Sequence, residues 1–138
     1  MTRMNPRAVI AALVGLVAAG CGGGKYPVRG TVTLDDGTPV ARGLVIFERT
    51  EGGKQITARG EIQPDGRFEV STDKPGDGVP AGKYRVLVNA LDPSDAPDEQ
   101  KKLPFDFRYQ KFETSGLEFE VKNEPNEYPI KLNRPKKK

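Results

Sequence analysis

The strongest constraint on this chain is a run of alternating apolar and polar residues at 83–90, which follows a turn rich in glycine and proline. Tyr84 and Val86 fall on one side of this run, and Lys83 and Arg85 fall on the other. A period of two residues is typical of a half-buried antiparallel β-strand. Because similar runs precede and follow it, we expect this strand to lie in the middle of a sandwich core.

Seven runs of this kind occur after the first 25 residues. They lie at 26–34, 44–47, 55–62, 67–71, 83–90, 117–121 and 128–132. The 16 Gly and 12 Pro residues are spread between them, as turns are in an all-β chain. Pro129 predicts an edge strand or a bulge. We therefore predict one all-β domain over 26–133, a seven-stranded antiparallel Greek-key sandwich without helices, with a small closed barrel as the alternative.

The N-terminal region has the pattern of a secretory signal. Arg3 and Arg7 precede an uninterrupted apolar run at 8–19. At about 1.5 Å per residue, this run would span roughly 18 Å as a helix, well short of the ~30 Å hydrocarbon core of a bilayer. We therefore interpret residues 1–20 as a cleaved signal peptide and not as a transmembrane anchor.

The segment Val17-Ala18-Ala19-Gly20-Cys21 resembles the bacterial lipobox. The resemblance implies cleavage between Gly20 and Cys21 and lipidation of Cys21, which is the only cysteine in the chain. Ala18 departs from the pattern, which more often has leucine there. The alternative is an ordinary secretory signal with a cysteine after the cut by chance.

Lipidation would make this a membrane-anchored protein of the cell envelope. One acyl chain holds a protein only marginally, whereas two or more hold it firmly. Residues 21–25 would then be the lipidated cysteine and a flexible tether of glycines. By resemblance to enterobacterial sorting, Gly22 in place of an aspartate favours the outer over the inner membrane.

Composition argues against several classes of function. Without the signal peptide the chain keeps 20 of its 22 basic residues against 19 acidic ones, so it offers no electrostatic case for nucleic acid. The absence of histidine and the single cysteine argue against a disulfide framework, a thiolate zinc site and the usual Ser–His or Cys–His pairs. We therefore predict no enzyme and no cofactor.

Weaker alternatives remain formally open. A Ser–Lys arrangement would have to use Ser71, Ser94 or Ser115, and a pair of carboxylates would have to come from outward strand positions or turns. Calcium would have to bind Asp35-Asp36 or the loop from Asp73 to Asp77. We favour the simpler interpretation that these aspartates cap turns.

Four of the ten aromatic residues gather at 105–112. They are Phe105, Phe107, Tyr109 and Phe112. One interpretation is a surface that contacts a sugar or a protein, because aromatic side chains dominate such contacts. The interpretation that we favour is that the 91–115 loop folds back and plugs one end of the sandwich. The alternation of the first three aromatic residues is typical of a short extra strand.

The chain ends in the basic segment 134–138, which we expect to be disordered. It could contact anionic lipid or cell-wall polymer. A solubilising end is the interpretation that we favour, because four charges are too few for stable binding alone.

The turn and strand motifs together resemble a known family. Three segments carry this resemblance: 30–40 with Asp36-Gly37, 65–68 with Asp65-Gly66, and 80–86 beginning Pro80-Ala81-Gly82. They are similar to the carboxypeptidase regulatory-like domain, a transthyretin-like (prealbumin-type) sandwich. With the lipobox, the aromatic segment and 114–117, the chain resembles small lipoproteins abundant in planctomycetes. The resemblance implies an accessory, non-catalytic module.

The predicted function is therefore structural or adhesive. We expect a lipid-anchored envelope protein that holds a protein or glycan partner near the membrane. The alternative is a carrier for a small ligand bound under the 91–115 loop. Ile46 and Leu87, apolar at outward strand positions, are the residues that we expect an adaptor to expose.

Overall fold

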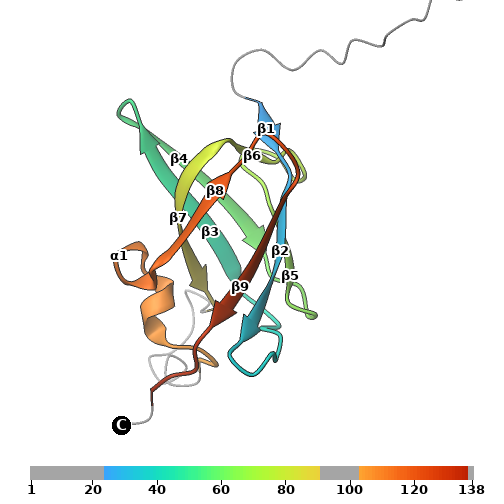
Figure 1. Ribbon diagram of the computed structural model, residues 1–138, viewed down its shortest axis with the longest axis vertical. Coiled ribbons are helices and arrows are strands. Elements are labelled where there is room, and N and C mark those ends of the chain that lie inside the picture. Colours follow the sequence, from blue (N-terminus) through green and yellow to red (C-terminus); the bar gives the residue numbers. More distant parts are fainter. Residues whose placement is uncertain (1–23, 91–102, 137–138) are drawn as a thin grey trace, which may run out of the picture.

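The computed structural model describes residues 24–90 and 103–136. The predicted signal peptide, Cys21, most of the tether, residues 91–102 and the last two lysines lie outside the described residues. The described chain confirms the all-β sandwich (Figure 1). Its strands are β1 (Lys25–Tyr26), β2 (Val28–Leu34), β3 (Leu44–Glu51), β4 (Lys54–Glu61), β5 (Arg67–Val70), β6 (Val79–Pro80), β7 (Gly82–Asn89), β8 (Leu117–Val121) and β9 (Asn126–Leu132).

Seven of these strands correspond to the predicted runs, and β1 and β6 form an additional two-residue pair. The three-stranded sheet has the order β5-β2-β9, and the four-stranded sheet has the order β4-β3-β7-β8. The prediction of a wholly antiparallel sandwich is wrong at one place, because β2 and β9 are parallel. The pairings β3–β7 and β7–β8 and the connections β2–β3 and β8–β9 each reverse the chain, so β9 runs in the same direction as β2.

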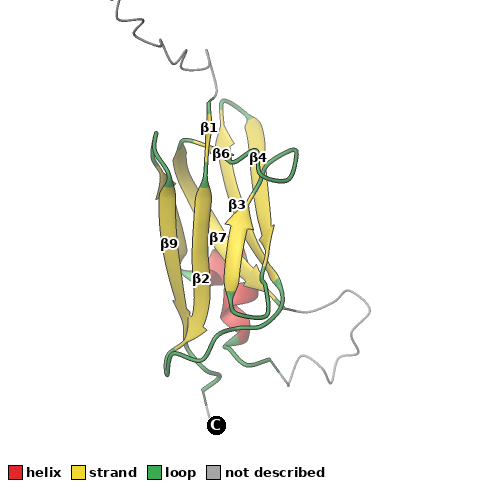
Figure 2. Cartoon of the chain, turned by 90° about the vertical axis from the view of Figure 1, so that its right-hand side faces the viewer, coloured by secondary structure: helices red, strands yellow, loops and turns green. Residues whose placement is uncertain are grey.

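The core lies between the two sheets (Figure 2). Phe47 is fully buried at its centre, with ring centroids of Tyr84, Phe119 and Tyr128 at 5.8, 5.9 and 6.1 Å. Burying a side chain of this size stabilises the fold by roughly 1.5–3 kcal/mol. Gly30 on β2 has no room for a side chain, because a Cβ there would lie 1.9 Å from the carbonyl oxygen of Tyr128.

The two sheets are joined differently along their two sides. At one side, Arg59 of β4 and Ser71, which directly follows β5, exchange two backbone hydrogen bonds of 2.9 Å each. These bonds connect β4 to β5. At the other side, β8 and β9 do not pair within the described chain, and the rings of Phe119 and Tyr128 stack across the seam with centroids 4.2 Å apart. The molecule is therefore a sandwich and not the closed barrel that was the alternative.

Residues 107–115 form helical turns and not the predicted extra strand. A 3₁₀ turn, η2 (Phe107–Gln110), begins after Asp106, whose side chain accepts a hydrogen bond from the backbone N–H of Arg108 (3.0 Å). A single turn of α-helix, α1 (Phe112–Ser115), ends at Gly116 with φ of 66°. Capping at both ends outweighs the weak alternation of the aromatic residues.

Candidate functional site

The aromatic segment is divided between the core and the surface. Phe105 is fully buried and Tyr109 is 3% exposed, and their rings meet edge to face with centroids 6.2 Å apart. Phe107 is 44% exposed, and Phe112 is half-buried beneath the guanidinium of Arg85. The structure therefore brings two of the four predicted contact residues together inside the core and leaves Phe107 on the surface.

The buried half of this segment is fastened to the end of β9. The Tyr109 hydroxyl accepts hydrogen bonds from the backbone N–H of Asn133 (3.1 Å) and from the guanidinium of Arg108 (2.7 Å). The second bond raises the pKa of Arg108. The backbone N–H of Asp106 donates to the carbonyl of Asn133 (3.0 Å). These bonds hold the segment at the end of the sandwich opposite β1 (Figure 1).

The segment also changes what β7 exposes. The prediction that Leu87 is exposed is wrong, because its exposed fraction is 8%. Both η2 and α1 contact β7, and they remove from water a position that the strand pattern assigns to solvent. Ile46 on β3 is partly buried, so neither residue offers a freely exposed apolar surface.

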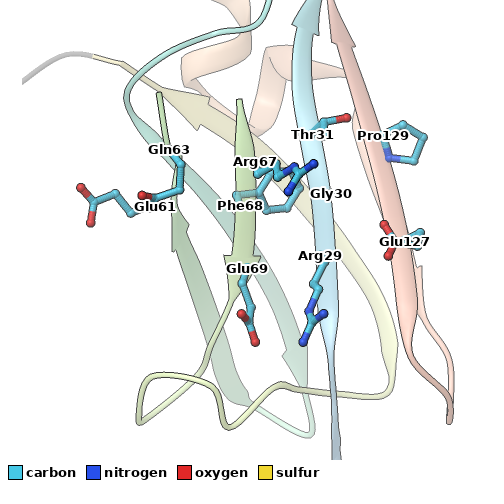
Figure 3. Close-up of a pocket in the computed structure, with 10 residues that line it drawn as sticks. All are labelled: Arg29, Gly30, Thr31, Glu61, Gln63, Arg67, Phe68, Glu69, Glu127 and Pro129. Carbon is cyan, nitrogen blue, oxygen red and sulfur yellow. The ribbon is translucent and has the colours of Figure 1, made fainter. Parts of the chain in front are cut away.

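A groove on the three-stranded sheet is the best candidate for a binding site. It has a volume of about 880 Å³ and is lined mainly by outward-facing polar side chains of β2, β5 and β9 and by the end of β4 (Figure 3). Beneath them, Gly30 and the buried ring of Phe68 form part of its floor.

The strand register sets the charges of this groove in rows. Arg29 on β2 lies directly between Glu69 on β5 and Glu127 on β9, and all three side chains are exposed. The next outward position of β2, Thr31, lies between Arg67 and Pro129. No ion pair within 4.0 Å joins Arg29 to any described acidic residue, so its guanidinium can donate to a bound molecule. Glu61 and Gln63 add an acceptor and an amide at the other rim.

Sequence reasoning missed this groove. Outward charged residues on strands are usually solvated, and nothing in a single sequence sets β5, β2 and β9 side by side. The alternation predicts which face each residue occupies, but the row of Arg29 with its two glutamates depends on the register between strands.

The predicted aspartate clusters cap turns, as the simpler interpretation has it. Asp77 accepts hydrogen bonds from the backbone N–H groups of Thr72, Asp73 and Lys74 and from the Lys25 ammonium (2.8–3.0 Å). Burial alone would raise the pKa of Asp77, but these hydrogen bonds outweigh it and hold the pKa well below its usual range.

The second cluster, Asp35 and Asp36, is also paired with groups of the protein itself. Asp36 accepts from the backbone N–H of Thr38 (3.0 Å), and this bond and an ion pair with Arg134 hold its pKa well below the usual range. Arg134 also lies 3.6 Å from Asp35. The first residue of the predicted disordered tail is thus held at the domain surface. In the part of the chain that the structure describes, no three acidic or other ligating side chains gather as a metal site requires.

The two described candidate serines form hydrogen bonds with backbone groups. The Ser71 hydroxyl accepts from the N–H of Gly76 (2.9 Å). Ser115 donates to the carbonyl of Val86 (2.5 Å) and accepts from the N–H of Leu117 (3.2 Å). Ser94 lies outside the described residues.

Comparisons with family models, with curated proteins and with solved structures find no match to this chain. Among the described residues, no helix is long and apolar enough to cross a membrane.

Proposed function

We propose that this chain is a non-catalytic, lipid-anchored module of the cell envelope that binds an envelope protein or glycan through the groove on β5, β2 and β9. The proposal rests on the row in which Arg29 lies between Glu69 and Glu127 and forms no ion pair with a described residue. Donors and acceptors arranged side by side on a rigid sheet suit the hydroxyl, amide and carboxylate groups of such a partner.

The anchor in this proposal is lipidated Cys21. The first described strand begins only four residues later, at Lys25, whose ammonium pairs with Asp73 (2.6 Å) and Asp77 (2.9 Å). Four residues span at most about 14 Å. The lipid would therefore hold the β1 end of the sandwich close to the membrane, with the outer membrane favoured over the inner.

We assign the sandwich to the transthyretin-like, Greek-key kind found in carboxypeptidase regulatory-like domains. This is supported by the place of two of its motifs, since Asp65-Gly66 forms the turn before β5 and Pro80-Ala81-Gly82 leads from β6 into β7.

A carrier with its site under the aromatic segment is not favoured. Phe105 and Tyr109, which would have to line such a site, are already packed in the core. Ligand entry would have to displace them, together with the hydrogen bonds to Asn133.

Site-specific photo-cross-linking on intact cells tests the proposal. A photoreactive residue replaces Thr31 in the groove, and the matched control replaces Thr57, another exposed threonine, on β4 of the other sheet. We expect one reproducible protein or glycan adduct from position 31 that is absent from position 57. Equal and diffuse adducts from both positions would contradict a dedicated partner at the groove.

A further inference from the structure

Within the described residues, the outer edge of β8 carries no further strand. Of the four edge strands of the two larger sheets, β4 and β5 are bridged to each other by the hydrogen bonds of Arg59 and Ser71. The other two, β8 and β9, lie on either side of the seam that only side chains cross. An unpaired edge presents a row of N–H and C=O groups to which another strand can bond.

One hydrogen bond shows which backbone groups of β8 point away from β7. The Tyr128 hydroxyl donates to the carbonyl of Glu118, a long contact of 3.4 Å that fixes the direction of this carbonyl away from β7. In an antiparallel ladder the backbone groups of one residue point to the same side, and alternate residues point to the same side. The backbone groups of Glu118 and Glu120 are therefore directed away from β7, while Leu117, Phe119 and Val121 pair with it.

The edge of β9 is protected by proline. The N–H of Asn126 donates to the carbonyl of Pro27 at the start of the parallel ladder (2.8 Å). The N–H groups of every second residue from Asn126 therefore point to β2, and the intervening positions point outward. Pro129 is one of these outward positions and has no N–H to offer. Proline at such a place blocks strand pairing, and β8 contains none.

The charges beside this edge identify the kind of strand that fits it. The side chains of Glu118 and Glu120 are exposed and have no ion pair within the described chain. Across the ladder on β7, Arg85 lies opposite Glu118 and Lys83 lies opposite Glu120. Arg85 is already paired with Glu48 (2.8 Å) and stacked on Phe112, and no ion pair within the described residues joins Lys83 to Glu120. A second copy of this chain would set glutamates against glutamates, which is unfavourable.

We infer that β8 accepts an extended segment of a partner protein with lysine or arginine at every second position, which adds a strand to the four-stranded sheet. The backbone of the segment bonds to Glu120 and to the N–H of Glu118, because the carbonyl of Glu118 already accepts from the Tyr128 hydroxyl. The basic side chains of the segment lie beside the carboxylates of both glutamates. This surface is separate from the groove on the other sheet.

Amide hydrogen exchange on the full-length protein in detergent tests the inference. The probe is an acetylated nine-residue peptide with lysine at every second position and valine or threonine between. We expect it to slow exchange of the Glu118 and Glu120 amides at least fivefold. The outward amides of Glu127 and Lys131 on β9 should not change. Slowing at β9 alone, or no slowing at all, would overturn the inference.

Two variants separate backbone pairing from charge. Glu120→Pro removes an outward N–H without removing a bond to β7, and should weaken peptide binding at least tenfold. Glu120→Gln keeps the N–H and should weaken binding only a few-fold. If Glu120→Pro does not fold, Glu118→Pro takes its place.

A peptide with glutamate in place of lysine is the remaining control, and it should not bind. Equal binding of the two peptides, or equal binding by the proline and glutamine variants, would contradict strand addition. These readouts do not involve Thr31, so the inference about β8 can fail while cross-linking at the groove succeeds, and the reverse.

Discussion

The stacked rings of Phe119 and Tyr128, with centroids 4.2 Å apart and planes 19° from parallel, join the two sheets where β8 and β9 do not pair. Aromatic pairs contribute about 0.5–1.5 kcal/mol beyond the area that they bury. The side of the sandwich that lacks a ladder is thus held by side chains.

A double-mutant cycle measures this contact. We expect Phe119→Ala and Tyr128→Ala each to lower the free energy of unfolding in urea by about 2 kcal/mol, because both rings also contact Phe47. The double variant should lose about 0.5–1.5 kcal/mol less than the sum of the two. Strict additivity would show that the stacking itself contributes nothing.

Ser115 joins the helical segment to β7 and starts β8. Ser115→Ala leaves the carbonyl of Val86 and the N–H of Leu117 without this partner, and it should lower the free energy of unfolding by about 1–3 kcal/mol. Thr114→Ala is the matched control, since its exposed hydroxyl bonds only to the carbonyl of Arg108. Chemical denaturation should rank the serine variant as the less stable, and the opposite rank would contradict this role.

Alanine substitutions of the two phenylalanines at 105 and 107 should differ sharply in their effect on stability. Phe105→Ala removes a fully buried ring and should lower the free energy of unfolding by about 3–5 kcal/mol. Phe107→Ala changes a ring that is 44% exposed and contacts the Lys111 ammonium, and should cost less than about 1 kcal/mol. Similar losses in thermal unfolding would mean that the segment is not divided between core and surface.

The free energy of unfolding should fall in acid because Asp77 becomes protonated. Its pKa is lower in the folded protein than the value of about 3.9 expected when unfolded. A carboxyl shifted in this direction stabilises the fold above the unfolded value, and that contribution disappears as pH falls through the folded value. Unfolding free energy should therefore decrease below about pH 5.

The variant Asp77→Asn should reduce this fall of the unfolding free energy in acid. Asp65→Asn is the control, because Asp65 accepts one backbone hydrogen bond, from Arg67, and Asp77 accepts three. Denaturation curves at several pH values measure both. If the unfolding free energy of the Asp77 variant falls in acid as steeply as before, Asp77 is not the cause of this pH dependence. The pKa of Lys25 is raised by its bonds to Asp73 and Asp77, so its contribution disappears in acid together with the charge of these carboxylates, and again at alkaline pH when the ammonium loses its proton.

Much of the sandwich was predictable because alternation reports directly on which face of a strand is buried. Tyr84, Val86 and Val88 are buried as expected, and Pro129 lies on an edge strand as its missing N–H requires. The parallel pairing of β2 with β9 was not predictable in the same way, because it depends on how the chain crosses between sheets.

The helical turns were missed because alternation is ambiguous over five residues. Alternation places Phe105, Phe107 and Tyr109 on one face, whereas the structure buries Phe105 and Tyr109 and leaves Phe107 44% exposed. The capping side chain of Asp106 was the signal that could have identified η2. Leu87 was misplaced for the same reason, since the turns that cover it were not expected.

The anchor is tested most directly by mass spectrometry of the N-terminal peptide of the protein purified from its native membranes. We expect a peptide that begins at Cys21 and carries lipid on its sulfur, and release of the Cys21→Ala variant from the membrane fraction. A peptide that begins at another residue, or a Cys21 with an unmodified thiol, would contradict a lipid-anchored envelope module.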